Sequence, residues 1–207
     1  MLEARRRITS LSNKMWIFAH IQTDGKGRRG RVWIDPVGNF ASTCVFFPKT
    51  TIDKFALSSF TAALSLYDSL DYFSQSKANI SIKWPNDILL NGKKVAGILL
   101  ETIAVGQNKV ALSIGFGVNL ISYPETSELE ESAFSPTSFI AETGVTLDPI
   151  DLLKNLALNF SNYEGTLKAK GFSEFLNILI SRIHKLGDQI VVKTTNETFN
   201  GRFLDIN

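Results

Sequence analysis

Residues 25–33 read Gly-Lys-Gly-Arg-Arg-Gly-Arg-Val-Trp, and the interpretation of this stretch decides the fold class. Its three glycines allow the main chain to pack closely against a ligand, and four cationic side chains lie at the same place. Such a combination suits a ligand that carries phosphate. The same letters match more than one nucleotide-binding pattern, so the surrounding sequence must discriminate between them.

The context excludes the common glycine-rich phosphate cradles. The dinucleotide pattern G-x-G-x-x-G requires a helix directly after its third glycine, whereas Arg31–Pro36 leads into a proline and a Gly-Asn pair. Val32 completes a kinase-like pattern, but the chain contains neither His-Arg-Asp nor Asp-Phe-Gly. A P-loop needs Lys and then Ser or Thr after the last glycine, where this chain has Arg and Val. A solvated surface turn remains as an alternative, although adjacent cations repel one another unless an anion is bound.

The composition describes one globular unit. The 207 residues are 44% hydrophobic and 20% charged, and the net charge of +2 gives no indication of a nucleic-acid binder. The single cysteine, Cys44, excludes an intramolecular disulfide and a cysteine-based zinc cluster, and its apolar neighbours predict a buried strand position. No apolar run reaches the ~18 residues of a membrane span, and the N-terminus lacks the apolar core of a secretory signal. We therefore expect a cytoplasmic protein that binds neither membrane nor nucleic acid.

Hydrophobic periodicity predicts an α+β fold, with a mixed, largely antiparallel sheet and helices packed on it. The expected strands are Trp16–Gln22, Ser42–Phe47, Ile80–Trp84, Ile88–Leu90, Val95–Ala104 and Val110–Val118. The expected helices are Leu2–Asn13, Asp53–Phe73 with Asp53 as its N-cap, Pro136–Glu142, Asp148–Lys168 and Phe172–Ile183. Asn91-Gly92 predicts a hairpin turn, and residues 119–136 are expected to form a loop.

The tail changes character at Leu186-Gly187-Asp188. Strands at Ile190–Lys193 and Phe199–Leu204, around the turn Thr195-Asn196-Glu197, predict a hairpin that begins a small β module. We therefore divide the chain into a main domain, residues 1–184, and a partial second domain, residues 185–207.

A second cluster of chemically active residues occupies positions 83–101, Lys-Trp-Pro-Asn-Asp-Ile-Leu-Leu-Asn-Gly-Lys-Lys-Val-Ala-Gly-Ile-Leu-Leu-Glu. Asp87 lies at the end of one strand, and Lys94 returns near it across the hairpin turn. Gly97 marks the close approach of a ligand, while Trp84 is expected to pack in the core. A carboxylate, two lysines and the arginine-rich loop can converge on one pocket, which suits the activation of a phosphate-bearing group.

Together with Gly115-Phe-Gly-Val-Asn119, these two stretches resemble the catalytic domain of biotin protein ligases. The resemblance covers essentially the whole chain, and Leu186-Gly187-Asp188 is similar to the entry of the family's small C-terminal SH3-like domain. The resemblance implies the class II aminoacyl-tRNA synthetase-like fold of these ligases. The resemblance is to the monofunctional type of ligase, since no helix-turn-helix segment precedes the catalytic motifs.

The resemblance implies an ATP-dependent ligase that joins biotin to a protein. Biotin and Mg²⁺-ATP first give biotinyl-5′-AMP and pyrophosphate, and the acyl group then passes to a lysine of the biotin carboxyl carrier protein of acetyl-CoA carboxylase. A lipoate–protein ligase shares the fold but is not expected to carry the Gly/Arg loop or Lys-Trp-Pro-Asn-Asp. A biotin-binding remnant without catalysis is the other alternative. The sequence specifies no metal ligands, and an oligomer is compatible with it.

Matching the family motifs position by position assigns three groups of residues. The catalytic residues are expected to be Arg28, Lys94 and Asp87. The residues expected to bind biotin are Gln22, Lys26, Gly27, Arg28, Lys94, Gly97, Gly115 and Gly117. The residues expected to bind ATP are Arg29, Arg31, Trp33, Lys83, Asn86 and Asn119, with Trp33 stacking on adenine.

Both ends depart from the family pattern. The family carries Ser/Thr-Thr-Asn, or a variant with Met third, before its first helix, and we expect Met1 to correspond to that third residue. On this hypothesis the first strand lies upstream of Met1. The chain also stops at Asn207, within the expected second domain.

Overall fold

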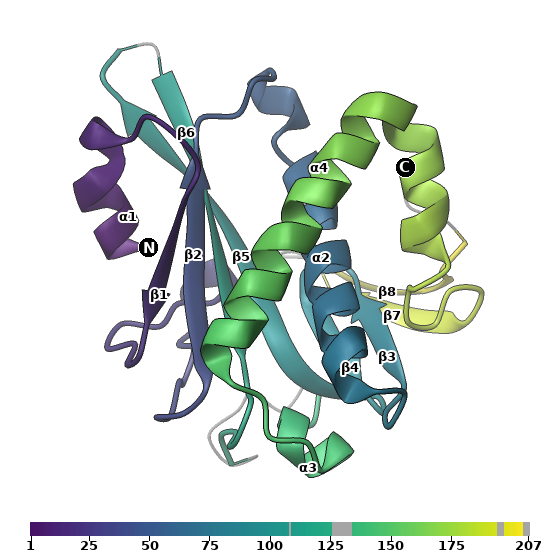
Figure 1. The fold of residues 1–207 in the computed structure, drawn as a ribbon. Coiled ribbons are helices and arrows are strands. Elements are labelled where there is room, and N and C mark those ends of the chain that lie inside the picture. Colours follow the sequence, from purple (N-terminus) through teal and green to yellow (C-terminus); the bar gives the residue numbers. More distant parts are fainter. Residues whose placement is uncertain (108, 126–133, 194–196, 205–207) are drawn as a thin grey trace.

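A computed structural model describes residues 1–107, 109–125, 134–193 and 197–204 (Figure 1). The helices are α1 (Leu2–Arg7), α2 (Leu57–Ser74), α3 (Phe139–Thr143) and α4 (Pro149–Ile180), with short 3-10 turns at Ile8–Ser10, Arg28–Gly30 and Ile52–Lys54. The strands are β1 (Met15–Ala19), β2 (Phe40–Phe46), β3 (Ile80–Lys83), β4 (Asp87–Leu90), β5 (Lys93–Val105), β6 (Lys109–Val118), β7 (Gln189–Lys193) and β8 (Thr198–Arg202).

The first six strands form one sheet in the order β1-β2-β6-β5-β4-β3. Every neighbouring pair of these strands is antiparallel, and the parallel contacts in the described residues are isolated bridges such as Ile82 with Ile183. Asn91 and Gly92 have φ angles of 49° and 78°, which suit the tight turn between β4 and β5. The predicted α+β class and the predicted hairpin are therefore confirmed.

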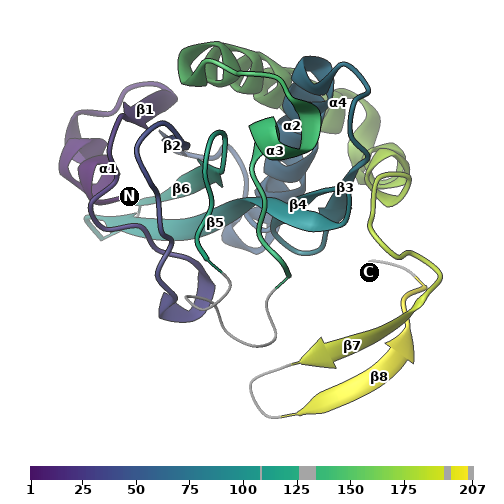
Figure 2. The same ribbon diagram turned by 90° about the horizontal axis from the view of Figure 1, so that it is seen from below.

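One face of the sheet packs against α2 and α4 (Figure 2). Because side chains alternate along a strand, the even-numbered residues of β6, such as Ile114 and Phe116, point to this face. Phe160 of α4 lies 5.8 Å from the ring of Trp16 and 6.1 Å from that of Phe46. Burial of these apolar side chains is the main stabilising contribution to this layer.

The opposite face is only partly covered by α1. Ala4 and Ile8 pack on Val45, Ile103 and Ala111, which lie at the far end of the central strands. At the near end of the same face the strands carry glycines instead of large apolar residues. The sheet thus has an apolar half under α1 and an open half, where the candidate site lies.

Cys44 lies in β2, where its side chain is completely buried. Burial raises the pKa of the thiol to about 12, so the sulfur stays protonated at neutral pH. The predicted buried strand position is confirmed.

The one helix cap predicted from the sequence does not form, and another helix has a cap that was not predicted. Asp53 lies inside the 3-10 turn Ile52–Lys54, and α2 begins only at Leu57 without a side-chain cap, so the predicted N-cap is wrong. Asp148 does cap α4, because its carboxylate accepts hydrogen bonds from the amides of Ile150 and Asp151.

The other predicted helices are present with shifted ends. The first helix is shorter than Leu2–Asn13, because α1 ends at Arg7 and continues as a 3-10 turn. The interruption expected between residues 168 and 172 is a kink at Gly171, whose φ of 80° breaks the helical geometry of α4. None of the helices in the described part of the chain combines the length and the apolar character that crossing a bilayer requires.

The tail forms the separate two-stranded sheet β7-β8. It is joined to the preceding turn by hydrogen bonds from Gly187 N to Phe203 O, 2.7 Å, and from Phe203 N to Asp188 O, 2.9 Å. The predicted hairpin is present, and the part of its turn at Thr195-Asn196 lies outside the described residues. Its assignment as the start of an SH3-like domain stays a prediction.

Asn39 ties the loop before β2 to the loop after β6. Its Oδ1 accepts hydrogen bonds from the amides of Leu120, Ile121 and Ser122 at 3.0, 3.0 and 3.3 Å, and its Nδ2 donates to Ser122 O at 2.9 Å. Asn39 is only 3% exposed, so its side chain supplies the hydrogen bonds that water would otherwise make to the main chain of residues 120–122.

Replacing Asn39 with alanine is expected to lower the free energy of unfolding by about 3 kcal/mol, because several main-chain groups lose their partner together. Urea denaturation followed by circular dichroism measures the loss. Asn162→Ala, at an exposed position of α4, is the matched control and is expected to change stability little. Equal stability of the two variants would contradict the role given to Asn39.

Candidate active site

A β-bulge between β4 and β5 determines which side chains face the open half of the sheet. Asp87 pairs with Gly97, whereas Leu89 pairs with Lys94, so Val95 is the extra residue on β5. Strict alternation would place Lys94 and Gly97 on opposite faces, since they are three residues apart. The bulge brings both to the face of Asp87, where a Cβ on Gly97 would lie 3.7 Å from Lys94 Nζ.

The Asp87 carboxylate lies between two lysines. Lys94 Nζ is 2.8 Å from Oδ1, and Lys83 Nζ is 3.6 Å from Oδ2. Asp87 is buried while both ammonium groups are partly exposed, so the cluster carries one excess positive charge toward the open side. Phe134 flanks it, with Lys83 Nζ 4.4 Å from the centre of its ring. This arrangement favours an anionic ligand.

The Gly/Arg stretch, expected to be a loop, is a short antiparallel ribbon. Gly27 N donates to Arg31 O at 2.8 Å, and Trp33 N donates to Gly25 O at 2.9 Å. A Cβ on Gly25 would lie 2.2 Å from Trp33 O, so only glycine permits this close approach of the two arms. Arg29 and Gly30 form the turn with φ angles of 59° and 75°.

Arg28 joins this ribbon to the second cluster. Its Nη1 donates a hydrogen bond to Asn86 Oδ1 at 3.2 Å. Asn86 is itself fixed, because its Nδ2 donates to Ile98 O and its carbonyl accepts from Ile98 N. The predicted convergence of the arginine-rich stretch with residues 83–101 is present in the geometry.

Glycines form the floor of the open half of the sheet. Gly97 and Gly117 are directly paired between β5 and β6, and the Trp33 ring lies across both. A Cβ on Gly97 would be 3.2 Å from Trp33 Cζ3, and one on Gly117 would be 2.6 Å from Trp33 Nε1. A Cβ on Gly115 would lie 3.1 Å from the terminal methyl carbon of Met1. In this structure the indole and the thioether thus occupy the space that the glycines leave.

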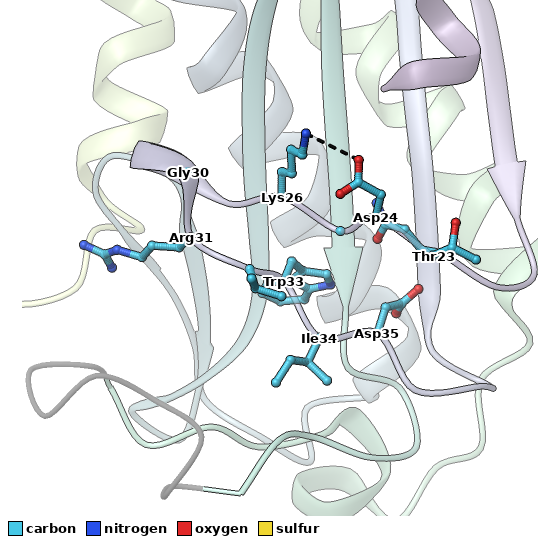
Figure 3. A pocket seen from close by; sticks show the side chains of 11 residues that line it. Thr23, Asp24, Lys26, Gly30, Arg31, Trp33, Ile34 and Asp35 are labelled. Atoms are coloured by element: carbon cyan, nitrogen blue, oxygen red, sulfur yellow. Dashed lines mark ion pairs between the residues drawn. The ribbon is translucent and has the colours of Figure 1, made fainter.

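A cavity of about 350 Å³ lies against the ribbon and is lined by residues of both of its arms and of the segments next to them (Figure 3). It is lined by Gln22, Thr23, Asp24, Gly25, Lys26, Gly30, Arg31, Val32, Trp33, Ile34 and Asp35. Lys26 Nζ pairs with Asp24 Oδ2 at 3.3 Å on its rim.

Two buried polar atoms of this lining have no hydrogen-bond partner in the structure, Trp33 Nε1 and Asp35 Oδ1. Burial raises the pKa of the Asp35 carboxyl from its ordinary value of 3.8 to about 6. Both atoms have lost water without gaining a partner, which is uncommon for buried polar groups.

The structure brings most of the predicted site residues together. Gln22, Lys26, Arg31 and Trp33 line the cavity, and the cluster of Asp87, Lys83 and Lys94 meets Trp33 where Lys94 Nζ lies 5.6 Å from its ring centre.

Two predicted positions lie differently from the rest. Asn119 is buried, and its Nδ2 donates to Thr137 O at 3.0 Å, which leaves only Oδ1 without a partner. Arg29 is exposed on the turn of the ribbon.

Trp84 is 48% exposed, so the prediction that it packs in the core is wrong.

Sequence reasoning missed Asp35 and Phe134. The sequence does contain an indication for Asp35, because this carboxylate directly follows the apolar run Val32–Ile34 and lies close to the cationic residues before it. Phe134 lies next to residues outside the described part of the chain, and its contact with Lys83 depends on tertiary structure alone.

Replacing Gly117 with alanine is expected to expel the indole of Trp33 from the floor, because the new methyl group would lie 2.6 Å from Nε1. The summed emission of Trp33 and Trp16 then shifts to longer wavelength, as measured in a Trp84→Phe background that removes the exposed third indole. Gly201→Ala, where a Cβ meets nothing within 4 Å, is the control. An unchanged emission spectrum of the Gly117 variant would show that Trp33 does not rest there in solution.

Replacing Asp35 with asparagine is expected to stabilise the protein at pH 8 and to have little effect near pH 4. Folding raises the pKa of the Asp35 carboxyl from 3.8 to about 6. The folded state therefore loses stability relative to the unfolded state as the pH increases through that range. Partial hydration limits the gain to about 1 kcal/mol or less. Thermal unfolding between pH 4 and 8 measures it, with the exposed Asp71→Asn on α2 as control. A gain that does not depend on pH would refute the assignment.

Comparison with known proteins identifies the family of this chain. Residues 1–119 match the model of the biotin/lipoate A/B protein ligase family. The chain is 41% identical over 201 residues to a biotin–[acetyl-CoA-carboxylase] ligase from Paracoccus denitrificans, covering 97% of this chain and 84% of that protein. It is 30% identical to the bifunctional ligase/repressor BirA of Bacillus subtilis, covering 92% of this chain and spanning 58% of the relative's length.

The fold matches the solved structure of a biotin protein ligase from Aquifex aeolicus in complex with biotin and ATP. The TM-score is 0.79 at 24% sequence identity, over 99% of this chain and 84% of the other. The similarity of sequence over nearly the whole chain, together with the family match, shows that this protein belongs to the biotin/lipoate A/B protein ligase family.

Proposed function

We propose that this protein is an ATP-dependent biotin–protein ligase that modifies the biotin carboxyl carrier protein of acetyl-CoA carboxylase. The observation that carries the proposal is the pairing of Lys83 and Lys94 with the buried Asp87 carboxylate, beside a floor of glycines and with Arg28 bonded to the neighbouring Asn86. The 41% identity to a biotin–[acetyl-CoA-carboxylase] ligase favours biotin over lipoate as the substrate.

The first step joins two anions, so its barrier is mainly electrostatic. A carboxylate oxygen of biotin attacks the α-phosphorus of ATP, pyrophosphate leaves, and an acyl–phosphate anhydride forms. Lys94, beside Gly97 on the floor, is placed to neutralise the biotin carboxylate. Arg28, fixed by Asn86, is placed to hold the anhydride as charge accumulates on phosphorus. Cations oriented before the reaction lower this barrier most effectively.

The second step needs a neutral amine. The carrier lysine must lose a proton before its nitrogen attacks the acyl carbon, and AMP leaves as the amide forms. Asp87 is the carboxylate of this cluster, and we assign it to orient that ammonium group or accept its proton. In the free protein Asp87 is engaged by Lys83 and Lys94, so the carrier lysine must take the place of one of them.

The remaining assignments follow the two ends of the site. Biotin is assigned to the residues of the ribbon and of the glycine floor, namely Gln22, Lys26, Gly27, Gly97, Gly115 and Gly117. The nucleotide is assigned to Arg29, Arg31, Lys83, Asn86 and Asn119, and the Trp33 ring, once it leaves the glycine floor, is assigned to stack on adenine.

The described residues provide no ready-made metal cage. They contain no group of three or more His, Cys, Asp or Glu side chains that could hold an ion, and Asp87 is flanked by lysines. Magnesium commonly binds through substrate phosphates and water with few protein ligands. We therefore assign Mg²⁺ to the ATP that enters and not to a site built by these residues.

Incorporation of labelled biotin into a carrier domain tests the function. The wild-type protein is expected to release pyrophosphate with biotin but not with lipoate, and to label the carrier lysine. Lys94→Ala and Arg28→Ala are each expected to lower kcat/KM by about 100-fold or more, as loss of a group that stabilises developing charge does.

Lys77→Ala removes an exposed lysine outside the cluster and is expected to retain wild-type activity. Biotin binding without AMP formation by the wild-type protein would identify a non-catalytic biotin-binding protein. Preferential use of lipoate would overturn the substrate assignment.

A further inference from the structure

A cluster of polar side chains outside the site joins α2 to the residues that follow α4. Arg182 Nη1 lies 2.7 Å from Asp68 Oδ1 and donates a hydrogen bond to the hydroxyl of Tyr163 at 2.7 Å. That hydroxyl in turn donates to the second oxygen of Asp68, and the guanidinium carbon lies 4.7 Å from the centre of the Tyr67 ring. The side chains of the ion pair are only 23% and 29% exposed, so loss of either partner leaves the other charge poorly solvated.

The two helices have contacts of their own that do not involve Arg182. Asn159 Nδ2 donates to Ser69 Oγ at 3.0 Å, and the hydrogen bond from Tyr163 to Asp68 runs directly between the helices. The apolar faces of α2 and α4 also share one core. What Arg182 adds is an anchor for the residues next to it in the chain.

Residues 182–184 lie along the outer edge of β3 (Figure 2). Ile82 N donates to Arg182 O at 2.8 Å, and Ile82 O accepts from His184 N at 2.9 Å. The next residue of β3 is Lys83, one of the two lysines beside the buried carboxylate. Two hydrogen bonds are too few to hold an unsupported segment at the edge of a sheet, and the side-chain contacts of Arg182 supply the support.

The same segment also supports the ammonium end of Lys83. The ring of His184 packs edge-to-face with that of Phe134, with 6.0 Å between their centres and 78° between their planes. Lys83 Nζ in turn lies 4.4 Å from the centre of the Phe134 ring. Burial, together with the charges of Lys185 and Lys83, keeps the pKa of His184 below its ordinary value, so the imidazole is neutral beside the ammonium at pH 7.

We propose that Arg182 is a positioning residue for the nucleotide, because it anchors residues 182–184 and this segment sets the position of the Lys83 ammonium. The inference rests on the proposed function, in which Lys83 is assigned to the nucleotide, and adds a residue that acts through others. A cation contributes most to phosphate binding when its position is fixed before the ligand arrives. The affinity for ATP therefore depends on an ion pair that lies outside the site.

The expected effect is confined to the nucleotide half of the site. Lys94, which is assigned to the biotin carboxylate, is held by other contacts, since its main chain bonds Ser135 and Thr137. Residues 182–184 take no part in those contacts. Loss of Arg182 is therefore expected to weaken ATP binding and to leave biotin binding nearly unchanged.

Calorimetric titration of Mg²⁺-ATP and, separately, of biotin into the whole protein tests the proposal. Arg182→Met keeps the apolar stem without the charge and is expected to weaken ATP binding about tenfold, as loss of one charge-assisted contact does. Its affinity for biotin is expected to change by less than about twofold. Arg182→Lys keeps a charge for Asp68 and is expected to recover most of the ATP affinity. Lys168→Met, at an exposed position of α4, removes an equal charge and is the control.

A double-mutant cycle separates the positioning of Lys83 from a general effect on the fold. In a Lys83→Met background, Arg182→Met is expected to cause little further loss of ATP affinity, since the residue through which it acts is absent. A loss of equal size in both backgrounds would show that Arg182 acts by another route and would overturn the inference.

The outcomes distinguish this inference from the proposed function. Wild-type affinity of the Arg182→Met protein for ATP, or an equal loss of affinity for ATP and biotin, overturns the inference while biotinylation by the wild-type protein still stands. A wild-type protein that binds no ATP overturns both.

Discussion

The ion pair between Asp87 and Lys94 is the interaction on which the geometry of the site depends. It forms only because the bulge at Val95 turns Lys94 toward the open face. The main chain of Lys94 in turn holds the segment that follows the long β6 loop, since its N–H donates to Ser135 O and its carbonyl accepts from Thr137 N. One residue therefore fixes both a charge in the site and the path of a distant part of the chain.

Glu142 reinforces this arrangement from outside the site. Its carboxylate accepts hydrogen bonds from Thr137 Oγ1 at 2.6 Å, Asn91 Nδ2 at 2.8 Å and Lys93 Nζ at 3.0 Å. These contacts join the β4–β5 turn to the segment that pairs with Lys94. Although burial opposes ionisation of Glu142, hydrogen bonds from Thr137, Asn91 and Lys93 keep its pKa below the ordinary value. Hydrogen bonds from two segments thus fix the start of β5, and such support is what holds a cation such as Lys94 in a precise position.

The sequence was sufficient for whatever depends on local pattern. Period-two alternation and the Asn91-Gly92 turn predicted the strands, and the arginine-rich stretch correctly indicated a partner for residues 83–101. It was insufficient where tertiary contacts override the pattern. Alternation alone places Lys94 and Gly97 on opposite faces of the sheet. Only the bulge brings them to the same face, and no residue type in the sequence predicts that bulge. Apolar character alone predicted burial of Trp84, and a favourable capping residue alone misplaced the start of α2.

The position of Trp33 on the glycine floor has a thermodynamic consequence. The indole is an intramolecular competitor for the space between Gly97 and Gly117, and it competes whatever the concentration of ligand. The apparent affinity for any molecule entering there is the intrinsic affinity multiplied by the fraction of time the indole is displaced. The length and stiffness of the Gly25–Trp33 ribbon therefore set the substrate concentration at which the protein responds, separately from the contacts that substrate makes.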